Sequence, residues 1–212
     1  MPSRACTPTG DSTADVLFGR LNGEQHALLE LVALPVCIVC ARVDEAGRRS
    51  LQGVLRDGVN DVGVRDDWRS RGGLCGRHWR VWRHLESPPL SSAILLEDLL
   101  GTYLESDRLR AVRCPACDIS ERAEARAITA LRRLPEAPLE KALVGGPGLL
   151  CLRHLDALPE GHVRSRFRTR LEELLEHLRE QVRTSDHRFA AERHGPHADA
   201  WLRALRVFGG DV

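Results

Sequence analysis

The sequence is poor in aromatic residues and contains a single lysine. Its 212 residues include four Phe, four Trp and one Tyr, and of its 31 basic residues only Lys141 is not an arginine. Asp and Glu together number 30, so the formal net charge is +1. A base-stacking platform needs aromatic side chains, and a nucleic-acid groove needs a broad positive field. Nucleic-acid binding is therefore disfavoured. We attribute the preference for arginine to a genomic bias rather than to function.

A long hydrophobic run is also missing. The most apolar stretch, residues 27–40, is too short to span a bilayer and contains Pro35. Residues 1–15 mix Pro, Ser, Thr and Gly without the apolar segment that a signal peptide carries. We expect these residues to form a disordered leader in which Cys6 is a bystander. We also expect a soluble, cytoplasmic protein without a membrane partner.

Six of the seven cysteines belong to a pattern that occurs twice. Each half of the chain has a Cys-x-x-Cys pair and then, after 34 residues in the first half and 33 in the second, a Cys-x-x-His pair. Corresponding residues of the two halves are 77, 77, 76 and 76 positions apart. The pattern consists of Cys37, Cys40, Cys75 and His78 in the first half and Cys114, Cys117, Cys151 and His154 in the second. This repeat indicates a duplicated metal-binding unit, because coincidence would not reproduce the spacing.

The ligand types in this pattern indicate structural zinc. Two cysteines three apart in a tight turn aim both sulfurs at one point, and a Cys and a His three apart on a helix share one face. Three thiolates and one imidazole fill all four positions of a tetrahedral zinc and leave none open for water. We therefore predict two zinc sites with all eight residues as metal ligands and no catalytic residue.

The spacing leaves the pairing of these ligands open. In the simpler arrangement, each half of the chain binds its own metal. In a swapped arrangement, Cys37 and Cys40 share a metal with Cys151 and His154. We take pairing within each half as the working prediction.

Three other interpretations of the cysteines compete with zinc. Redox dithiols usually stand alone, and they would leave the Cys-x-x-His pairs unexplained. Cysteines that are simply small buried side chains would not account for the repeat. An iron–sulfur cluster with one histidine ligand is chemically allowed, since thiolates suit zinc and iron–sulfur clusters alike. The iron–sulfur cluster therefore stays open as the alternative cofactor.

Acidic residues and histidines outside the pattern give weaker metal candidates. A carboxylate-bridged di-iron centre needs Glu-x-x-His pairs, which the candidate helices lack. Histidines in a polar terminal segment that lack the spacing of metal ligands usually face water. The candidates for the first site are Glu97, Asp98, Glu172, Glu173 and His177, and those for the second are His187, His194 and His197 with Asp186 and Asp199. Both sites are disfavoured.

The apolar residues follow helical spacing, and no alternating strand pattern is present, which predicts an all-α fold. We expect helices over residues 44–57, 62–70, 119–134 and 138–144, an amphipathic helix before the first cysteine pair, and a longer helix after each Cys-x-x-His pair. In the longer helices Leu95 aligns with Leu171, and Leu99 aligns with Leu175, at the same 76-residue offset. We expect these two helices to pack together or to occupy equivalent places about a pseudo-twofold axis.

The predicted organisation is two pseudo-repeated helical units, each holding a Cys3His metal knuckle. The first unit covers residues 16–110 and the second covers residues 111–212, after the leader at 1–15. Trp68, Trp79 and Trp82 surround the first Cys-x-x-His pair in the sequence, so we expect them to pack around that knuckle. An aromatic anchor for a partner is the alternative role.

The chain resembles a family of uncharacterised, largely helical bacterial proteins with duplicated Cys-Pro-x-Cys and Gly-x-Cys-x-x-His motifs. The resemblance spans most of residues 30–209 and includes the Cys-Pro-Ala-Cys knuckle at 114–117, the segments at 72–78 and 148–154, the helix at 93–100 and the stretch from 186 to 201. The first knuckle departs from the pattern because Cys37-Ile-Val-Cys40 lacks the proline. Gly148 lies one residue further from its cysteine, and His187 stands where an aromatic residue is expected. The resemblance supports the architecture and implies no activity.

Together these observations predict a zinc-stabilised helical scaffold that binds a protein partner in an interaction or regulatory role. The alternative is a redox protein or sensor that uses an iron–sulfur cluster or a labile zinc–thiolate site. A second alternative is a nucleic-acid-binding regulator. Enzymatic activity is disfavoured, because closed Cys3His sites leave no coordination position for a substrate.

Overall fold

The structure is a computed structural model that describes residues 21–86, 89–106, 113–192 and 195–209. Within these ranges the chain forms helices and no strand, which confirms the predicted all-α class. No helix in this part of the chain is both long enough and apolar enough to cross a membrane. The predicted leader and Cys6 lie outside the described residues.

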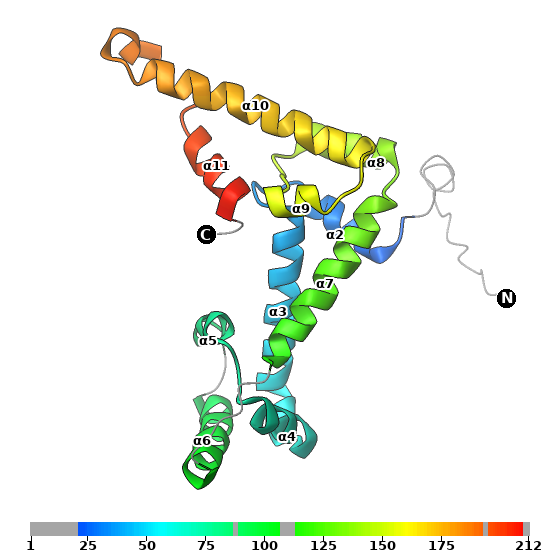
Figure 1. Cartoon of the computed structure of the whole chain (residues 1–212), viewed down its shortest axis with the longest axis vertical. Coiled ribbons are helices and arrows are strands. Elements are labelled where there is room, and N and C mark those ends of the chain that lie inside the picture. Colours follow the sequence, from blue (N-terminus) through cyan, green and yellow to red (C-terminus); the bar gives the residue numbers. More distant parts are fainter. Residues whose placement is uncertain (1–20, 87–88, 107–112, 193–194, 210–212) are drawn as a thin grey trace, which may run out of the picture.

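The helices are short to medium in length and follow one another closely (Figure 1). In chain order they are α2 (Gly23–Leu31), α3 (Ile38–Arg56), the 3-10 helix η1 (Gly58–Asn60), α4 (Val62–Arg71), α5 (Gly76–Arg83), α6 (Pro89–Ser106), α7 (Pro115–Arg132), α8 (Glu136–Gly145), α9 (Leu152–Asp156), α10 (His162–Thr184), the 3-10 helix η2 (His187–Glu192) and α11 (Ala200–Gly209).

The helices expected at 62–70 and 138–144 are present as α4 and α8. Those expected at 44–57 and 119–134 are α3 and α7, and both begin one or more turns earlier than predicted. The reason is the cysteine pairs, which start these helices instead of forming separate turns: Cys37 is the N-cap of α3 and Cys114 is the N-cap of α7. Pro115 favours the start of α7 because its fixed φ suits the first helical position.

Helices α3 and α7 pack against each other in opposite directions and form the central column of the molecule (Figure 1). Small residues let them approach closely. The buried face of α7 carries Ala116, Ala123, Ala127 and Ala130. On α3, a Cβ added to Gly47 would lie 3.2 Å from the Ser120 hydroxyl of α7. The start of α3 therefore lies beside the end of α7, and the start of α7 beside the end of α3.

A hydrophobic core lies at each end of this column. Core 1 joins α2, the first half of α3, the second half of α7, α8, α9 and α10, and its most buried members include Leu28, Leu131, Leu139, Leu150 and Phe167. Core 2 joins the second half of α3, α4, α5, α6 and the start of α7, and its members include Leu51, Trp68, Trp82, Leu95 and Leu99. Each core thus contains residues from both sides of the boundary expected between residues 110 and 111.

The two longer helices lie at opposite ends of the molecule, with α6 beside core 2 and α10 beside core 1, so they do not pack together (Figure 1). Their aligned leucines also differ in environment, because Leu99 is buried whereas Leu175 is 45% exposed. Helix α11 packs on α10 through Ala200, Ala204 and Val207. The pseudo-twofold relation between the halves stays a prediction.

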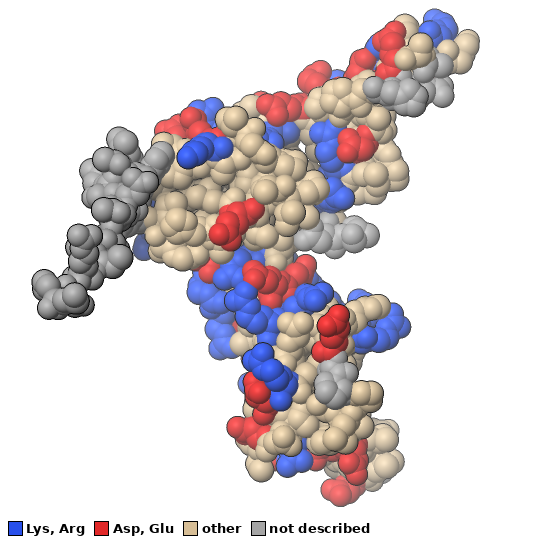
Figure 2. Space-filling model, turned by 180° about the vertical axis from the view of Figure 1, so that it is seen from behind, with Lys and Arg blue, Asp and Glu red and all other residues tan. Residues whose placement is uncertain are grey.

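Charged side chains of both signs cover the surface. Figure 2 shows arginines gathered over the middle of the molecule, with Asp and Glu side chains among them. Several of these charges form ion pairs between helices, such as Arg69 of α4 with Asp98 of α6 and Arg71 of α4 with Asp118 of α7. The arginines therefore serve partly as links between helices.

Candidate metal sites

The eight predicted ligands gather in two clusters of four. Site I consists of Cys37, Cys40, Cys151 and His154, and site II consists of Cys75, His78, Cys114 and Cys117. In each cluster the four candidate ligand atoms lie within 4.8 Å of one another. Within the described ranges, these are the clusters of three or more Cys, His, Asp or Glu side chains that could hold a metal ion.

The pairing within each half of the chain, which we predicted from the sequence, is wrong. Each site combines the Cys-x-x-Cys pair of one half with the Cys-x-x-His pair of the other. The physical reason is the length of α3, whose 19 residues span about 28 Å at 1.5 Å per residue. Cys37 and Cys40 start this helix, and Cys75 and His78 follow it at the far end of the column. The two pairs of one half therefore cannot meet.

A shared local design positions all four ligand pairs. The first cysteine of each pair is the N-cap of a helix, namely of α3, α5, α7 and α9, and the second ligand lies in the first turn of that helix. Free N–H groups and the positive end of the helix dipole favour thiolates at this place. Each site is thus built from two helix N-termini that converge on one point.

The distances within the sites suit a tetrahedral ion. With Zn–S bonds of about 2.3 Å and Zn–N bonds of about 2.0 Å, two sulfurs lie about 3.8 Å apart, and a sulfur and a nitrogen about 3.5 Å apart. In site I the Sγ atoms of Cys40 and Cys151 are 3.9 Å apart, and the three sulfurs lie 3.1–3.4 Å from His154 Nδ1. In site II Cys75 Sγ lies 3.7 Å from Cys117 Sγ.

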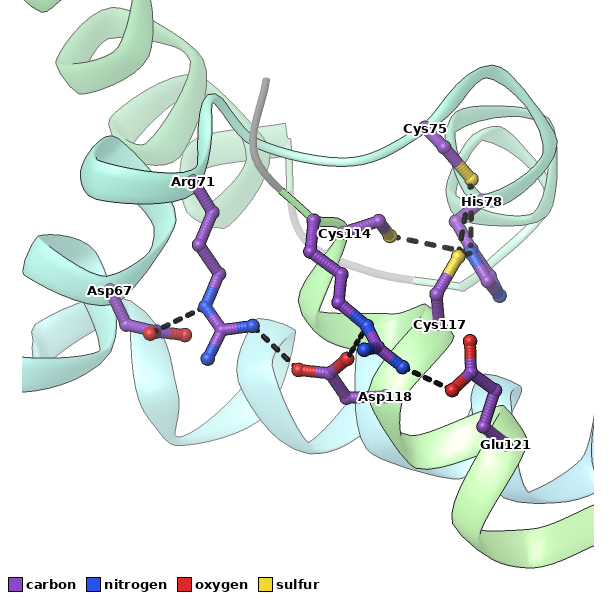
Figure 3. Close-up of polar contacts among 9 residues, drawn as sticks. Asp67, Arg71, Cys75, His78, Cys114, Cys117, Asp118 and Glu121 are labelled. Atoms are coloured by element: carbon purple, nitrogen blue, oxygen red, sulfur yellow. Dashed lines mark hydrogen bonds and ion pairs between the residues drawn. The ribbon is translucent and has the colours of Figure 1, made fainter. Parts of the chain in front are cut away.

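Site II shows the same convergence around His78 Nδ1, which lies 3.3 Å from the sulfur of Cys75, 3.4 Å from that of Cys114 and 3.5 Å from that of Cys117 (Figure 3). The six cysteines of the two sites are free, because their sulfurs are too far apart for the roughly 2.05 Å bond of a disulfide. Both clusters therefore present free sulfurs and one ring nitrogen to a common centre.

A backbone contact fixes the two halves of site I together. Leu149 N–H donates to the carbonyl of Val36 at 3.0 Å, and Ile38 N–H donates to the carbonyl of Leu149 at 3.1 Å. The preceding glycines allow this approach: a Cβ on Gly146 would lie 2.1 Å from the Val32 carbonyl oxygen, and one on Gly148 would lie 2.7 Å from Val32 Cα. The glycine-rich segment before Cys151 is therefore required for close backbone contact with the segment before Cys37.

Around site II, tryptophans and ion pairs provide the support. The rings of Trp68, Trp79 and Trp82 have centroids 5.3–6.3 Å apart, so the expected tryptophan cluster beside the knuckle is present. Arg71 Nη1 donates to Asp118 at 2.6 Å, which ties α4 to the residue that follows Cys117 (Figure 3). Arg113 forms further ion pairs with Asp118 and Glu121.

Burial and mutual hydrogen bonds shift the pKa values of the metal-free ligands. In site I, hydrogen bonds from Cys37 and Cys40 lower the pKa of Cys151, while a hydrogen bond to Cys151 raises the pKa of Cys40. Burial lowers the pKa of His154, but its hydrogen bonds to Cys151 and Cys37 outweigh burial and raise the pKa to about 10. Site I therefore concentrates negative charge on Cys151 beside the imidazole.

In site II the pKa of one cysteine is also lowered and that of another raised, but the pKa of the histidine shifts in the opposite direction. Burial raises the pKa of Cys117 to about 12. Burial also opposes ionisation of Cys75, but hydrogen bonds, first from the His78 backbone and then from Cys117, lower its pKa. Burial, with the charge of Arg77, lowers the pKa of His78. The shifts thus make Cys75 more acidic than Cys117 and favour the neutral form of the His78 imidazole.

A carboxylate that was not expected from the sequence lies behind His154. Glu124 of α7 accepts a hydrogen bond from His154 Nε2 at 3.0 Å and also binds Arg153 at 2.7 Å. A hydrogen bond to the far ring nitrogen fixes the tautomer that leaves Nδ1 free to bind a metal. No sequence pattern points to this carboxylate, because Glu124 is one of several charged residues along its helix.

The weaker metal candidates do not assemble. Glu97 and Asp98 lie on α6, whereas Glu172, Glu173 and His177 lie on α10 at the other end of the molecule (Figure 1). His187 is 92% exposed beside Asp186, and His177 contacts Arg203. His197 is buried, and no hydrogen-bond partner for its Nε2 is present in the described ranges. His194 lies outside the described residues.

Comparison with protein-family models, curated protein sequences and solved structures gave no match. The resemblance to a helical bacterial family therefore stays an expectation, and the geometry of the two sites carries the functional argument.

Proposed function

We propose that the protein is a helical interaction scaffold stabilised by zinc in both sites. The observation that carries the proposal is the convergence of three sulfurs and one ring nitrogen at tetrahedral distances in each cluster. Four protein ligands complete the coordination of zinc and leave no open position, which is typical of a structural rather than a catalytic metal.

The compactness of the clusters favours a single ion over an iron–sulfur cluster. In such a cluster the four protein ligands are distributed over two or more iron atoms bridged by sulfide, so they do not all lie at the distances of ligands around one ion. The sulfur separations of 3.7 and 3.9 Å suit ligands of one shared ion. Zinc is the ion that most often takes Cys3His ligation in structural sites.

The metals would act as cross-links between distant segments. Site I joins the start of α3 to α9, and site II joins α5 to the start of α7. Helices α5 and α9 have 8 and 5 residues, which is too short for stable helices on their own. Structural zinc supplies about 10 kcal/mol or more of apparent folding free energy in small peptides. Metal binding would therefore hold both short helices in place.

Two exposed apolar helix faces support an interaction role. Helix α6 exposes Leu96, Leu100, Tyr103 and Leu104, and helix α11 exposes Trp201, Leu202, Leu205 and Phe208. In both sets the residues are spaced so that they share one face of the helix. Exposed apolar residues that share a helix face suit contact with a partner. We propose a protein partner in the cytoplasm, with no catalytic activity and no nucleic-acid substrate.

Metal analysis together with an absorption spectrum of anaerobically purified protein tests the proposal. Two zinc ions per chain without visible absorbance are expected. Iron with acid-labile sulfide and a brown colour would instead favour the redox alternative, which draws support from the half-buried sulfurs of Cys40, Cys75 and Cys117. Nucleic-acid affinity that falls steeply with salt would favour the regulator alternative.

A further inference from the structure

The two sites share their ligands but differ in what lies behind the histidine. In site I the carboxylate of Glu124 accepts the hydrogen bond from His154 Nε2. In site II, no hydrogen-bond partner of His78 Nε2 is found in the described part of the chain, although its Nδ1 faces all three sulfurs. Only the first histidine is therefore held at both ring nitrogens.

The sequence repeat explains this difference. The cysteine pairs of α3 and α7 are 77 positions apart, so the counterpart of Glu124 on α3 is Gly47. Gly47 lies at the corresponding place in the structure as well, because a Cβ added there would be 3.7 Å from His78 Nε2. Site II thus has a glycine where site I has the carboxylate.

The neighbouring arginines confirm the correspondence. Arg153 and Arg77 occupy equivalent positions before the two histidines. Arg153 binds the same Glu124 that holds His154, at 2.7 and 2.9 Å. Arg77 binds Asp44 at 2.5 Å, one turn before Gly47 on α3, and no hydrogen bond joins Asp44 to His78. Asp44 therefore binds Arg77 but does not support His78.

The ligands of site II are also more exposed than those of site I. In site I only Cys40 is partly exposed, while Cys37, Cys151 and His154 are buried. In site II both Cys75 and Cys117 are partly exposed. A chelator or a competing thiol thus meets two accessible sulfurs in site II and one in site I.

From these observations we infer that site II is an exchangeable metal site and that site I is a permanent one. The inference rests on the proposed metal binding. Loss of an outer-shell partner typically weakens metal affinity by about 10- to 100-fold, so site II binds zinc more weakly by about this factor. Release from site II frees α5, which carries Trp79 and Trp82, and loosens the end of the molecule that presents the apolar face of α6.

The tryptophans allow the two sites to be distinguished in the intact protein. Trp68, Trp79 and Trp82 all pack in core 2, whereas the fourth tryptophan, Trp201 of α11, is 53% exposed and belongs to neither core. The test is an equilibrium competition for zinc between the two-zinc protein and a zinc-binding dye. Dye absorbance and tryptophan emission are both recorded. We expect two zinc affinities that differ by about 10- to 100-fold. The tryptophan emission should change when zinc leaves the weaker site.

Variants of the two outer-shell positions complete the test. Glu124→Ala should weaken the tighter site about tenfold or more, whereas Glu121→Ala, on the same helix but paired with Arg113, should leave that site unchanged. Gly47→Glu should tighten the weaker site relative to Gly47→Ala, which adds the same contact with Ser120 but no carboxylate.

Equal zinc affinities at the two sites, or an emission change on zinc release from the tighter site, would overturn the inferred difference between the sites. Neither result would contradict the proposed zinc-stabilised scaffold. Purified protein that binds no zinc would overturn both.

Discussion

The two ends of the molecule hold the same ligand set by different means. Core 1 is almost entirely aliphatic, with Phe167 as its large aromatic residue, and site I depends on backbone contact between the segments around Gly146 and Val32. Core 2 packs three tryptophans beside site II and ties its helices with ion pairs such as Arg71–Asp118. The repeated pattern therefore constrains the arrangement of the four candidate ligands, while the residues that support them differ between the two ends.

The strongest test of this comparison separates the two halves of the chain, since each site takes two ligands from either half. A chain truncated after residue 110 keeps one ligand pair of each site, so it should bind no zinc tightly and should lack the cooperative unfolding of the full chain. Coexpression with residues 111–212 should restore two zinc ions, because both sites need both halves. Metal analysis and circular dichroism check this outcome.

A double substitution gives the matched control. Replacing Cys37 and Cys151 by serine removes two ligands of site I, so one zinc should remain. Replacing Cys37 and Cys75 removes one ligand from each site and should weaken both. The opposite result in metal analysis would restore pairing within each half of the chain.

The second test concerns the tryptophans of core 2. Trp82→Ala should lower the free energy of unfolding by about 3–5 kcal/mol, because it leaves a cavity between α4, α5 and α6. It also removes the indole N–H that lies 3.2 Å from the Ser92 hydroxyl oxygen. Urea unfolding of the zinc-saturated protein measures the loss. Trp201→Ala is the control, since that side chain is 53% exposed and its removal leaves no cavity.

The third test concerns the backbone contact at core 1. Gly146→Ala should destabilise the protein by about 1–3 kcal/mol, because the new methyl group would overlap the Val32 carbonyl and push the two segments apart. Gly145→Ala, one residue earlier, meets open space and should have little effect. Equal unfolding midpoints for the two variants would contradict the assigned role of the contact.

Much of this arrangement is predictable from the sequence, and the limits are instructive. Helical spacing predicts the all-α class and the existence of α4 and α8, and the repeat identifies the eight residues that cluster. The pairing fails because a sequence period states which residues correspond, not which of them meet. Recognising Cys37 as a helix N-cap would have lengthened the helix expected at 44–57 to its observed start. The length of this helix alone then separates the Cys-x-x-Cys pair of the first half from its Cys-x-x-His pair.

The supporting residues are harder to predict, because each depends on a contact between segments far apart in the chain. Gly146 resembles an ordinary turn glycine until its approach to Val32 is known. Glu124 resembles any charged residue on a solvated helix face until His154 is placed beside it. The comparison with Gly47 becomes informative only after the two helices are known to run in opposite directions.

The smallest predicted effect concerns the polar link between α2 and α7 in core 1. Gln25 is buried, caps α2 together with Asn22, and donates a hydrogen bond to the carbonyl of Arg133 at 3.0 Å. Gln25→Ala should therefore cost about 1 kcal/mol, since it removes a helix cap and leaves carbonyl groups at the end of α7 without a partner. The exposed Glu30 on the same helix serves as the control, and Glu30→Ala should leave the unfolding midpoint unchanged. Because core 2 contains no part of α2, the tryptophan emission change on zinc release should be the same in both variants. An altered emission change in Gln25→Ala would mean that the two ends respond to each other and do not act as separate cores.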